Sequence, residues 1–183
     1  MKKTRRFASL ATAAILAACA VVPATMSALP VSAVTANTVT FMKSGSDDTA
    51  THTYKAYQIF SGSVDGENKL TNVQWANADK GADFLAALKA DRTIGNSFAA
   101  CETAAAVAAV LGEQEADSTL LQNFATFAAS QKENLKVVNA AAAESITVVG
   151  DGYYLFEDVS ALTGDNATGA KTRYLIAQVD ASE

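Results

Sequence analysis

The stretch HTYKAYQIFSG, residues 52–62, carries large apolar side chains on both faces of an extended chain. Read with a period of two, these side chains divide between the two faces, with Tyr54, Ala56 and Phe60 on one and Tyr57 and Ile59 on the other. Such a pattern is typical of a strand that is covered on both sides, and not of a strand half open to water.

A turn signal and a second apolar run follow this stretch. Asp65-Gly66 marks the turn, and the run LTNVQW occupies residues 70–75, so residues 53–75 are predicted to form a β-hairpin. Ahead of the hairpin, NTVTFMK at residues 37–43 predicts a short opening strand.

The composition changes after the hairpin. Residues 77–135 are rich in alanine, leucine and glutamate and poor in β-branched residues, which favours helix. Three helices are expected. The first is predicted at residues 79–90, with Phe84, Leu85 and Leu88 on one stripe. The second is predicted at residues 97–111, with Ser97 as its N-cap and Gly112 at its end. The third begins at Asp117 or Ser118, and its side chains facing a core are Leu120, Phe124, Phe127 and Ala128.

The pattern then returns to strands. SITVV at residues 145–149, the turn at residues 150–152 and YYLFED at residues 153–158 predict a second hairpin, and residues 172–179 predict a last strand. Residues 34–183 are therefore expected to form one α+β domain, with strands first and last and helices between them. The side chains expected to be mostly buried are Tyr57, Ile59, Trp75, Phe84, Phe124, Tyr154, Phe156 and Leu175.

The N-terminal residues 1–33 have the pattern of a secretory signal peptide. The basic segment MKKTRRF precedes an apolar run, and small residues follow it, which places cleavage between Ala33 and Val34. Pro30 and an earlier proline interrupt the apolar run, which disfavours a transmembrane anchor. An alternative stays open, because LAAC also has the form of a bacterial lipobox in which Cys19 is lipidated.

Charge argues against nucleic-acid binding, and cysteine content argues against an internal disulfide. Removal of residues 1–33 leaves ten Lys and Arg against nineteen Asp and Glu, and a chain of this charge is a poor partner for nucleic acid. Cys101 is then the one remaining cysteine, so no internal disulfide is expected, and the residue is interpreted as a small apolar side chain in an alanine-rich helix.

The sequence contains no strong catalytic or metal-binding pattern. His52 is the single histidine and is interpreted as a surface or strand-edge residue, and no serine lies in a G-x-S-x-G pattern. The acidic pair Asp47-Asp48 and the acidic residues between 113 and 117 lack calcium-loop spacing. The tripeptide NAT at residues 166–168 matches a weak glycosylation acceptor. No enzyme, metal or cofactor is predicted.

The order of motifs resembles one family. YKAYQIFSG, LTNVQWA, FLAALK, AAAVAAVL, GDGYYLFED and TRYLIAQV, taken together, look like the N-terminal domain of the major pilins that Gram-positive bacteria join with sortases. The resemblance covers nearly all of residues 37–180, and its most specific pieces are the first hairpin and GYYLFED. It implies a β-sandwich-like, immunoglobulin-like domain with an alanine-rich helical insertion, in which YKAYQIF is an inner strand.

The resemblance also implies parts that this chain does not carry. In such pilins further domains, an LPxTG sorting signal, an apolar segment and a basic tail normally follow, and a linking lysine lies in a proline-containing motif after the first domain. The sequence ends at Glu183 without them. Two interpretations stay open: the front part of a longer pilin, or a shortened gene product that sortase does not polymerise through these parts.

Pilin domains often contain a Lys–Asn isopeptide bond formed beside a buried carboxylate, which requires a neutral amine and a protonated acid. By resemblance, Lys43 stands at the donor position and Glu157 at the acid position. The last strand, residues 172–179, has no asparagine to accept the bond. Lys43 and Glu157 are therefore interpreted first as ordinary strand-end charges, and no internal isopeptide bond is expected.

The expected function is a secreted structural subunit of a cell-surface fimbrium in the cell wall, used in adhesion. Its expected partners are other pilin subunits, sortase if the chain is part of a longer pilin, and a host surface receptor. The alternative is a secreted or lipid-anchored binding module for host glycan or matrix protein.

Overall fold

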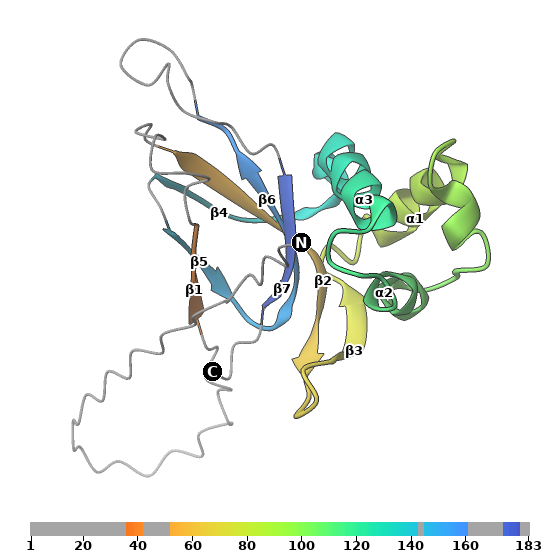
Figure 1. Ribbon diagram of the computed structural model, residues 1–183, viewed down its shortest axis with the longest axis horizontal. Coiled ribbons are helices and arrows are strands. Elements are labelled where there is room, and N and C mark those ends of the chain that lie inside the picture. The colour runs from red at the N-terminus through yellow and green to blue at the C-terminus, as the bar shows by residue number, and fades with distance from the viewer. Residues whose placement is uncertain (1–35, 42–51, 143–144, 161–173, 180–183) are drawn as a thin grey trace, which may run out of the picture.

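The computed structural model describes residues 36–41, 52–142, 145–160 and 174–179 (Figure 1). The strands are β1 (Ala36–Thr40), β2 (Thr53–Val64), β3 (Leu70–Trp75), β4 (Lys136–Ala142), β5 (Ser145–Val149), β6 (Gly152–Asp158) and β7 (Tyr174–Val179). The helices are α1 (Gly81–Ala90), α2 (Ala104–Gly112) and α3 (Thr119–Ser130), with 3-10 turns η1 (Gly95–Phe98) and η2 (Lys132–Asn134).

The long strand β2 organises the larger sheet. Its residues 54–61 pair with β6, residues 53–58 pair with β4, and residues 60–64 pair with β3, all antiparallel. Because the stretch paired with β6 overlaps both of the others, β3 and β4 share the opposite edge of β2 and follow one another along it. β7 extends this five-stranded sheet beyond β6, and β1 pairs with β5 in a separate two-stranded sheet. The predicted second hairpin is therefore wrong, because β5 pairs with β1 and β6 pairs with β2 and β7.

The helices and the small sheet cover opposite faces of the large sheet. Figure 1 shows α1, α2 and α3 gathered on one side, and β1 and β5 on the other. The fold is therefore α+β, as predicted, and its two antiparallel sheets and three helices are compatible with a sandwich-like arrangement.

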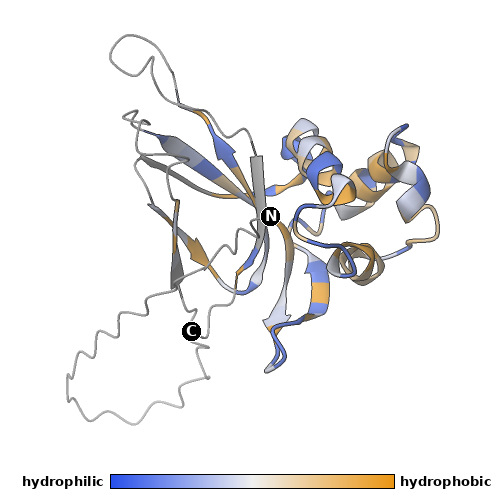
Figure 2. Cartoon of the chain, viewed as in Figure 1, coloured by the Kyte–Doolittle hydropathy of each residue, from blue (hydrophilic) through white to orange (hydrophobic). Residues whose placement is uncertain are grey.

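Two hydrophobic clusters fill the two sides. The helix-side cluster joins β2 to the helices, and Figure 2 shows hydrophobic residues along all three helices. Its fully buried large side chains are Ile59, Phe60, Phe84, Leu88, Phe98, Val107, Phe124 and Leu155. The second cluster lies under the small sheet and contains Ala56, Ile146, Val148, Tyr154, Phe156 and Val179.

The predicted core is largely confirmed. The side chains of Tyr57, Ile59, Phe84, Phe124, Tyr154 and Phe156 are buried. Trp75 is half-buried and packs against the helix-side cluster. It contacts Gly81 at the start of α1, where a Cβ atom would lie 2.3 Å from the indole, so only glycine admits this approach. Leu175 lies in β7, but its side chain is outside the described residues.

The predicted face of Phe60 is wrong. Phe60 packs in the helix-side cluster with Tyr57 and Ile59, and not with Ala56. A bulge between Gln58 and Phe60 in the pairing with β6 shifts the alternation by one residue. Gly152 of β6 lies against this bulge, and a Cβ atom there would be 2.3 Å from the Phe60 carbonyl oxygen, so the close approach requires glycine.

The helix predictions are confirmed in part. α3 follows Ser118, whose hydroxyl accepts a hydrogen bond from the Leu121 amide at 3.2 Å, as expected of an N-cap. The second helix was placed too early. Residues 95–98 form a 3-10 turn, and α2 starts only after Thr103, whose hydroxyl caps it. Cys101 is buried as expected, but it lies between η1 and α2 and not in a helix.

The sequence prediction missed β4. Three of its seven residues, KVVNAAA, are alanine, and no turn signal precedes them, so local propensity does not indicate a strand. β4 forms because the free edge of β2 supplies backbone partners for it. Val138 faces the second cluster, whereas Val137 is 66% exposed.

Candidate functional site

Several residues singled out from the sequence lie outside the described residues. They are Cys19, Ala33, Val34, Lys43, Asp47, Asp48 and the tripeptide at residues 166–168. Glu157 is described, and its surroundings are the first candidate site.

Glu157 of β6 binds a lysine from the helical side. Lys132 Nζ lies 2.7 Å from Glu157 Oε1 and 2.9 Å from Oε2, and the Tyr57 hydroxyl donates to Oε2 at 3.3 Å. The ammonium group also lies 5.9 Å from the centre of the Tyr57 ring, within cation–π range. The Glu157 side chain is only 14% exposed, so this is a partly desolvated ion pair that fastens η2 to the sheet.

The electrostatics of this cluster favour a neutral phenol at Tyr57. Burial raises the pKa of Tyr57, and the negative charge of Glu157 raises it further, while Lys132 acts in the opposite direction. A charged lysine and a charged glutamate are the stable forms of a salt bridge, and they differ from the neutral amine and protonated acid that isopeptide formation needs.

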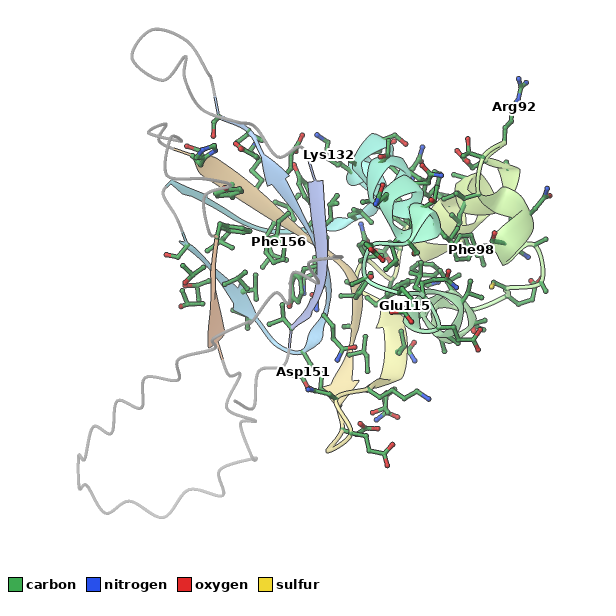
Figure 3. All side chains as sticks on the ribbon, in the orientation of Figure 1. Arg92, Phe98, Glu115, Lys132, Asp151 and Phe156 are labelled. Carbon is green, nitrogen blue, oxygen red and sulfur yellow. The ribbon has the colours of Figure 1, made fainter. Side chains whose placement is uncertain are left out.

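The sheet separates Glu157 from the described end of the opening strand. Phe156, its neighbour in β6, faces the other side and meets the ring of Phe41 at 5.4 Å between centroids. Figure 3 shows Lys132 beside α3 and Phe156 toward β1 and β5. Glu157 therefore faces the helices, whereas Phe41 lies on the opposite face of the sheet.

His52 is buried, so its interpretation as a surface or strand-edge residue is wrong. Only 4% of the residue is exposed, and Nδ1 lies 2.7 Å from Asp158 Oδ2. Its ring also stacks near that of Tyr54, at 6.0 Å between centroids. The period of two that places Tyr54 on the inner face also places His52 there, so the sequence held a signal for this burial.

Asp158 accepts two further hydrogen bonds from Ser160. The Ser160 amide donates to Asp158 Oδ1 at 2.9 Å, and the Ser160 hydroxyl donates to the same oxygen. The hydroxyl oxygen in turn accepts from the Thr53 amide at 2.8 Å, and the Val159 amide donates to the Thr53 carbonyl at 2.8 Å. These bonds join the start of β2 to the end of β6.

The His52, Asp158 and Ser160 cluster has the residue types of a hydrolase triad but not its order. In a triad the hydroxyl donates to the imidazole, which removes its proton. Here the single hydroxyl proton is directed to the carboxylate. Burial raises the pKa of Asp158, but the hydrogen bonds from Ser160 and His52 outweigh it and hold that pKa below its ordinary value.

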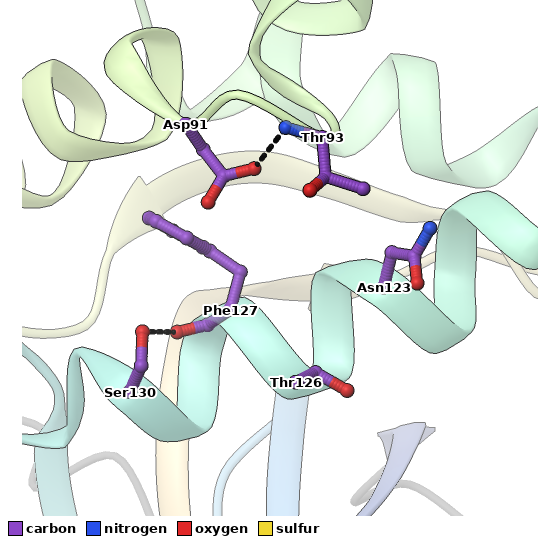
Figure 4. A pocket seen from close by; sticks show the side chains of 6 residues that line it. All are labelled: Asp91, Thr93, Asn123, Thr126, Phe127 and Ser130. Carbon is purple, nitrogen blue, oxygen red and sulfur yellow. Dashed lines mark hydrogen bonds between the residues drawn. The ribbon is translucent and has the colours of Figure 1, made fainter.

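A small hollow lies between the α1–η1 connection and α3. Its lining residues are Asp91, Thr93, Asn123, Thr126, Phe127 and Ser130 (Figure 4). Asp91 Oδ1 accepts from the amides of Thr93 and Ile94, and the Ser130 hydroxyl donates to the Phe127 carbonyl at 2.7 Å. Carboxylate, amide and hydroxyl groups thus surround an aromatic side chain.

Neither a metal-binding cluster nor a membrane-spanning helix is found among the described residues. Within them, no group of three or more His, Cys, Asp or Glu side chains is placed to hold a metal ion. None of the helices in the same ranges has the length and apolar character needed to cross a membrane.

Comparison with known proteins gives no match to a protein family, to a curated protein or to a solved structure.

Proposed function

We propose that this chain is a structural subunit, or the N-terminal part of one, of a sortase-assembled cell-surface fimbrium used in adhesion. The observation that supports this most is the relation of the two most pilin-like segments. YKAYQIF in β2 and GYYLFED in β6 are neighbours in one sheet, and their aromatic side chains fill both cores. This agrees with the resemblance, which treats YKAYQIF as an inner strand with core aromatic side chains and not as a site.

The same proposal includes an immunoglobulin-like sandwich with a helical insertion. β3 and β4 lie one after the other on the same edge of β2, so the chain leaves this edge after residue 75 and returns to it at residue 136. The helices occur between these two points. An insertion into a strand-paired framework has this geometry, and the β1–β5 sheet supplies the second layer.

The proposed route to the surface begins with cleavage between Ala33 and Val34. The mature subunit then has other pilin subunits and sortase as partners when it is part of a longer pilin, and a host surface receptor at the assembled fimbrium. A structural role agrees with buried, paired polar groups, because such groups hold strands in register.

The test is a blot of cell-wall extracts from the producing bacterium, boiled in detergent and probed with antibodies against residues 52–160. Covalent polymers predict a ladder of high-mass bands that collapses to a single band when the sortase genes are deleted. A strain without the gene for this chain is the control for antibody specificity. One monomer-sized band in the parent and in the sortase mutant contradicts the proposal.

A second candidate function, a glycan-binding module, is favoured by the small hollow beside α3. Its carboxylate, amide and hydroxyl groups match the hydroxyls of a sugar ring, and the buried Phe127 lies below them. Thr93 and Thr126 are exposed and Asn123 is half-buried, so a ligand reaches them without any rearrangement of the core.

An NMR titration with a panel of mono- and disaccharides tests this candidate. Binding predicts saturable shifts of the Asn123 and Thr126 amides that are lost in Asn123→Ala. Thr38→Ala, on the exposed face of β1 across the molecule, is the matched control and should bind as the parent does. Absence of saturable shifts at these amides for every sugar excludes the hollow as a glycan site.

A further inference from the structure

We propose that His52, Asp158 and Ser160 form a proton-operated latch, which holds one end of the five-stranded sheet closed at neutral and mildly acidic pH and releases it in stronger acid. The proposal rests on the position, burial and hydrogen bonding of these three residues, and it is independent of the fimbrial function.

The latch lies where two parts of the chain enter and leave the sheet. His52 immediately precedes β2, and Asp158 is the last residue of β6. The segments 42–51 and 161–173 are continuous in sequence with its two halves. The bonds from Thr53 to Ser160 and from Val159 to Thr53 continue the pairing of β2 and β6 beyond the regular ladder.

The charged atoms of the latch are removed from water. The His52 side chain is 4% exposed and the Asp158 side chain is fully buried. Ser160 is also buried, and every buried side-chain polar atom among the described residues has a partner. In such surroundings a paired charge is held strongly, and a charge that loses its partner is costly.

The hydrogen-bond directions make the latch respond to protons in two steps. Asp158 Oδ1 faces two Ser160 donors and Oδ2 faces His52 Nδ1, which carries the proton when it meets a carboxylate. Protonation of the imidazole leaves all of these bonds in place and turns the pair into an ion pair. Protonation of Asp158 instead puts a proton on an oxygen that already faces a donor, and it removes the negative charge of the His52–Asp158 pair.

The pH window follows from the direction of the Asp158 shift. Hydrogen bonds lower its pKa in the folded protein, despite burial. A carboxyl group with a lowered pKa contributes its full stabilisation above its unfolded value, about 3.9, and loses it as the pH falls through the folded value. Release of the latch is therefore expected below about pH 4, and not at the pH at which a histidine alone changes charge.

Other charges near the latch are accounted for among the described residues. Lys55 and Glu157, the nearest charged residues in β2 and β6, alternate to the opposite face, where Lys132 binds Glu157. Ala142 of β4, which pairs with Thr53, is uncharged. Tyr54 presents an aromatic ring to His52. Lys43, Asp47 and Asp48 lie outside the described residues.

The test is amide hydrogen exchange by NMR on the full chain at pH 7, 5 and 3, expressed as protection factors corrected for the intrinsic rate. The amides of Thr53, Val159 and Ser160 report on the latch, and that of Phe124 in α3 reports on the helix-side core. We expect equal protection of the three latch amides at pH 7 and 5, and a fall of several-fold, at most about tenfold, at pH 3, while Phe124 stays protected.

Variants separate the latch from general acid sensitivity. Asp158→Asn, which lacks one acceptor oxygen, should show lowered protection of the latch amides at pH 7 and no further fall at pH 3. Glu157→Gln, one residue away on the opposite face, is the matched control and should behave as the parent does. Ser160→Ala, which keeps the His52 contact, should show partial loss and replaces Asp158→Asn if that variant does not fold.

Three results overturn the latch. They are unchanged protection of the latch amides at pH 3, simultaneous loss of Phe124 protection with them, and parent-like protection at pH 7 in folded Asp158→Asn or Ser160→Ala. The first shows that the carboxylate does not hold this end closed, the second that acid unfolds the whole molecule, and the third that these bonds do not carry the closure.

Discussion

At the scale of single residues, Glu157 and Asp158 are adjacent acids with opposite surroundings. Glu157 faces the helices and binds a lysine, and Asp158 faces the second cluster and binds the single histidine. The alternation of a strand places neighbours on opposite faces, so one dipeptide fastens the sheet to two different layers. Residue-level predictions therefore depend on the face of the sheet that each side chain occupies.

Phe124→Ala should destabilise the protein several times more than Phe41→Ala. Phe124 is fully buried and packs against the rings of Phe84, Phe98 and Phe127, so its truncation leaves a cavity and costs about 3–5 kcal/mol. Phe41 is half-buried beside the opening strand. Denaturant titration measures both losses. Equal losses would mean that α3 does not pack on the sheet.

Alkaline pH should unfold the protein through its buried tyrosines. Burial raises the pKa of Tyr153 and of Tyr154 to about 12, and the Asp151 carboxylate adds to the effect at Tyr154. Because an unfolded tyrosine ionises near pH 10, unfolding above this pH releases protons, and stability falls as the pH rises from about 10 to 12. Tyrosinate absorbance and circular dichroism, recorded together, check this.

In that titration, some of the five tyrosines should ionise only as the fold is lost. Tyr153→Phe removes one ionisable group and should move the alkaline midpoint to higher pH. Ionisation of all five near pH 10 with an unchanged circular dichroism spectrum would disprove the expected coupling.

At the scale of secondary structure, the helices begin where side chains cap them. Ser118 caps α3 and Thr103 caps α2, each by accepting from the amide three residues on. Both are serine or threonine before an apolar run, which is the ordinary N-cap pattern. The sequence predicts Ser97 as the cap of the second helix, and this prediction is wrong because Thr103 caps it.

Thr103→Ala should cost about 1 kcal/mol of stability, as is usual for loss of an N-cap hydrogen bond. Ser97→Ala is the matched control, since Ser97 is exposed within the 3-10 turn η1 and should have little effect. Thermal or denaturant unfolding compares the two. A larger loss for Ser97→Ala would restore the helix start that the sequence predicted.

The elements that sequence reasoning recovered are those with strong local signals. The alternating run of β2, the Asp65-Gly66 turn and the capped α3 carry their own pattern, and each is present. β4 forms by pairing with β2, and Phe60 takes its face of the sheet because of the bulge in the pairing of β2 with β6. A short stretch of sequence contains neither pairing partner, so local patterns do not predict these two features. The same holds for the candidate site at His52. The alternation of β2 indicates that His52 is buried, but its contact with Asp158, 106 residues away in the sequence, is known only from the fold.

At the scale of the whole molecule, one sheet carries a core on each face without a disulfide among the described residues. Cys101 is a free, buried thiol, and burial raises its pKa, with opposing smaller effects from Lys89 and Glu102. The links between layers are hydrophobic packing, the ion pair of Lys132 with Glu157, and the His52–Asp158 contact. All of these links are non-covalent, so an internal isopeptide bond would change the stability of the entire fold.

The chain that remains after the proposed cleavage should therefore have the mass of residues 34–183, without the loss of one ammonia or one water that an isopeptide bond produces. Bond formation requires a neutral lysine, an amide or acid acceptor, and a protonated carboxyl group in an apolar site. Glu157, the acid expected from the resemblance, is engaged by Lys132, and the last strand has no asparagine. Intact-mass measurement followed by peptide mapping is the check. A loss of ammonia or water that maps to a peptide containing Lys43 would refute this prediction and strengthen the pilin proposal, whereas a loss of one water at Lys132 would show that its ion pair with Glu157 converts to an amide.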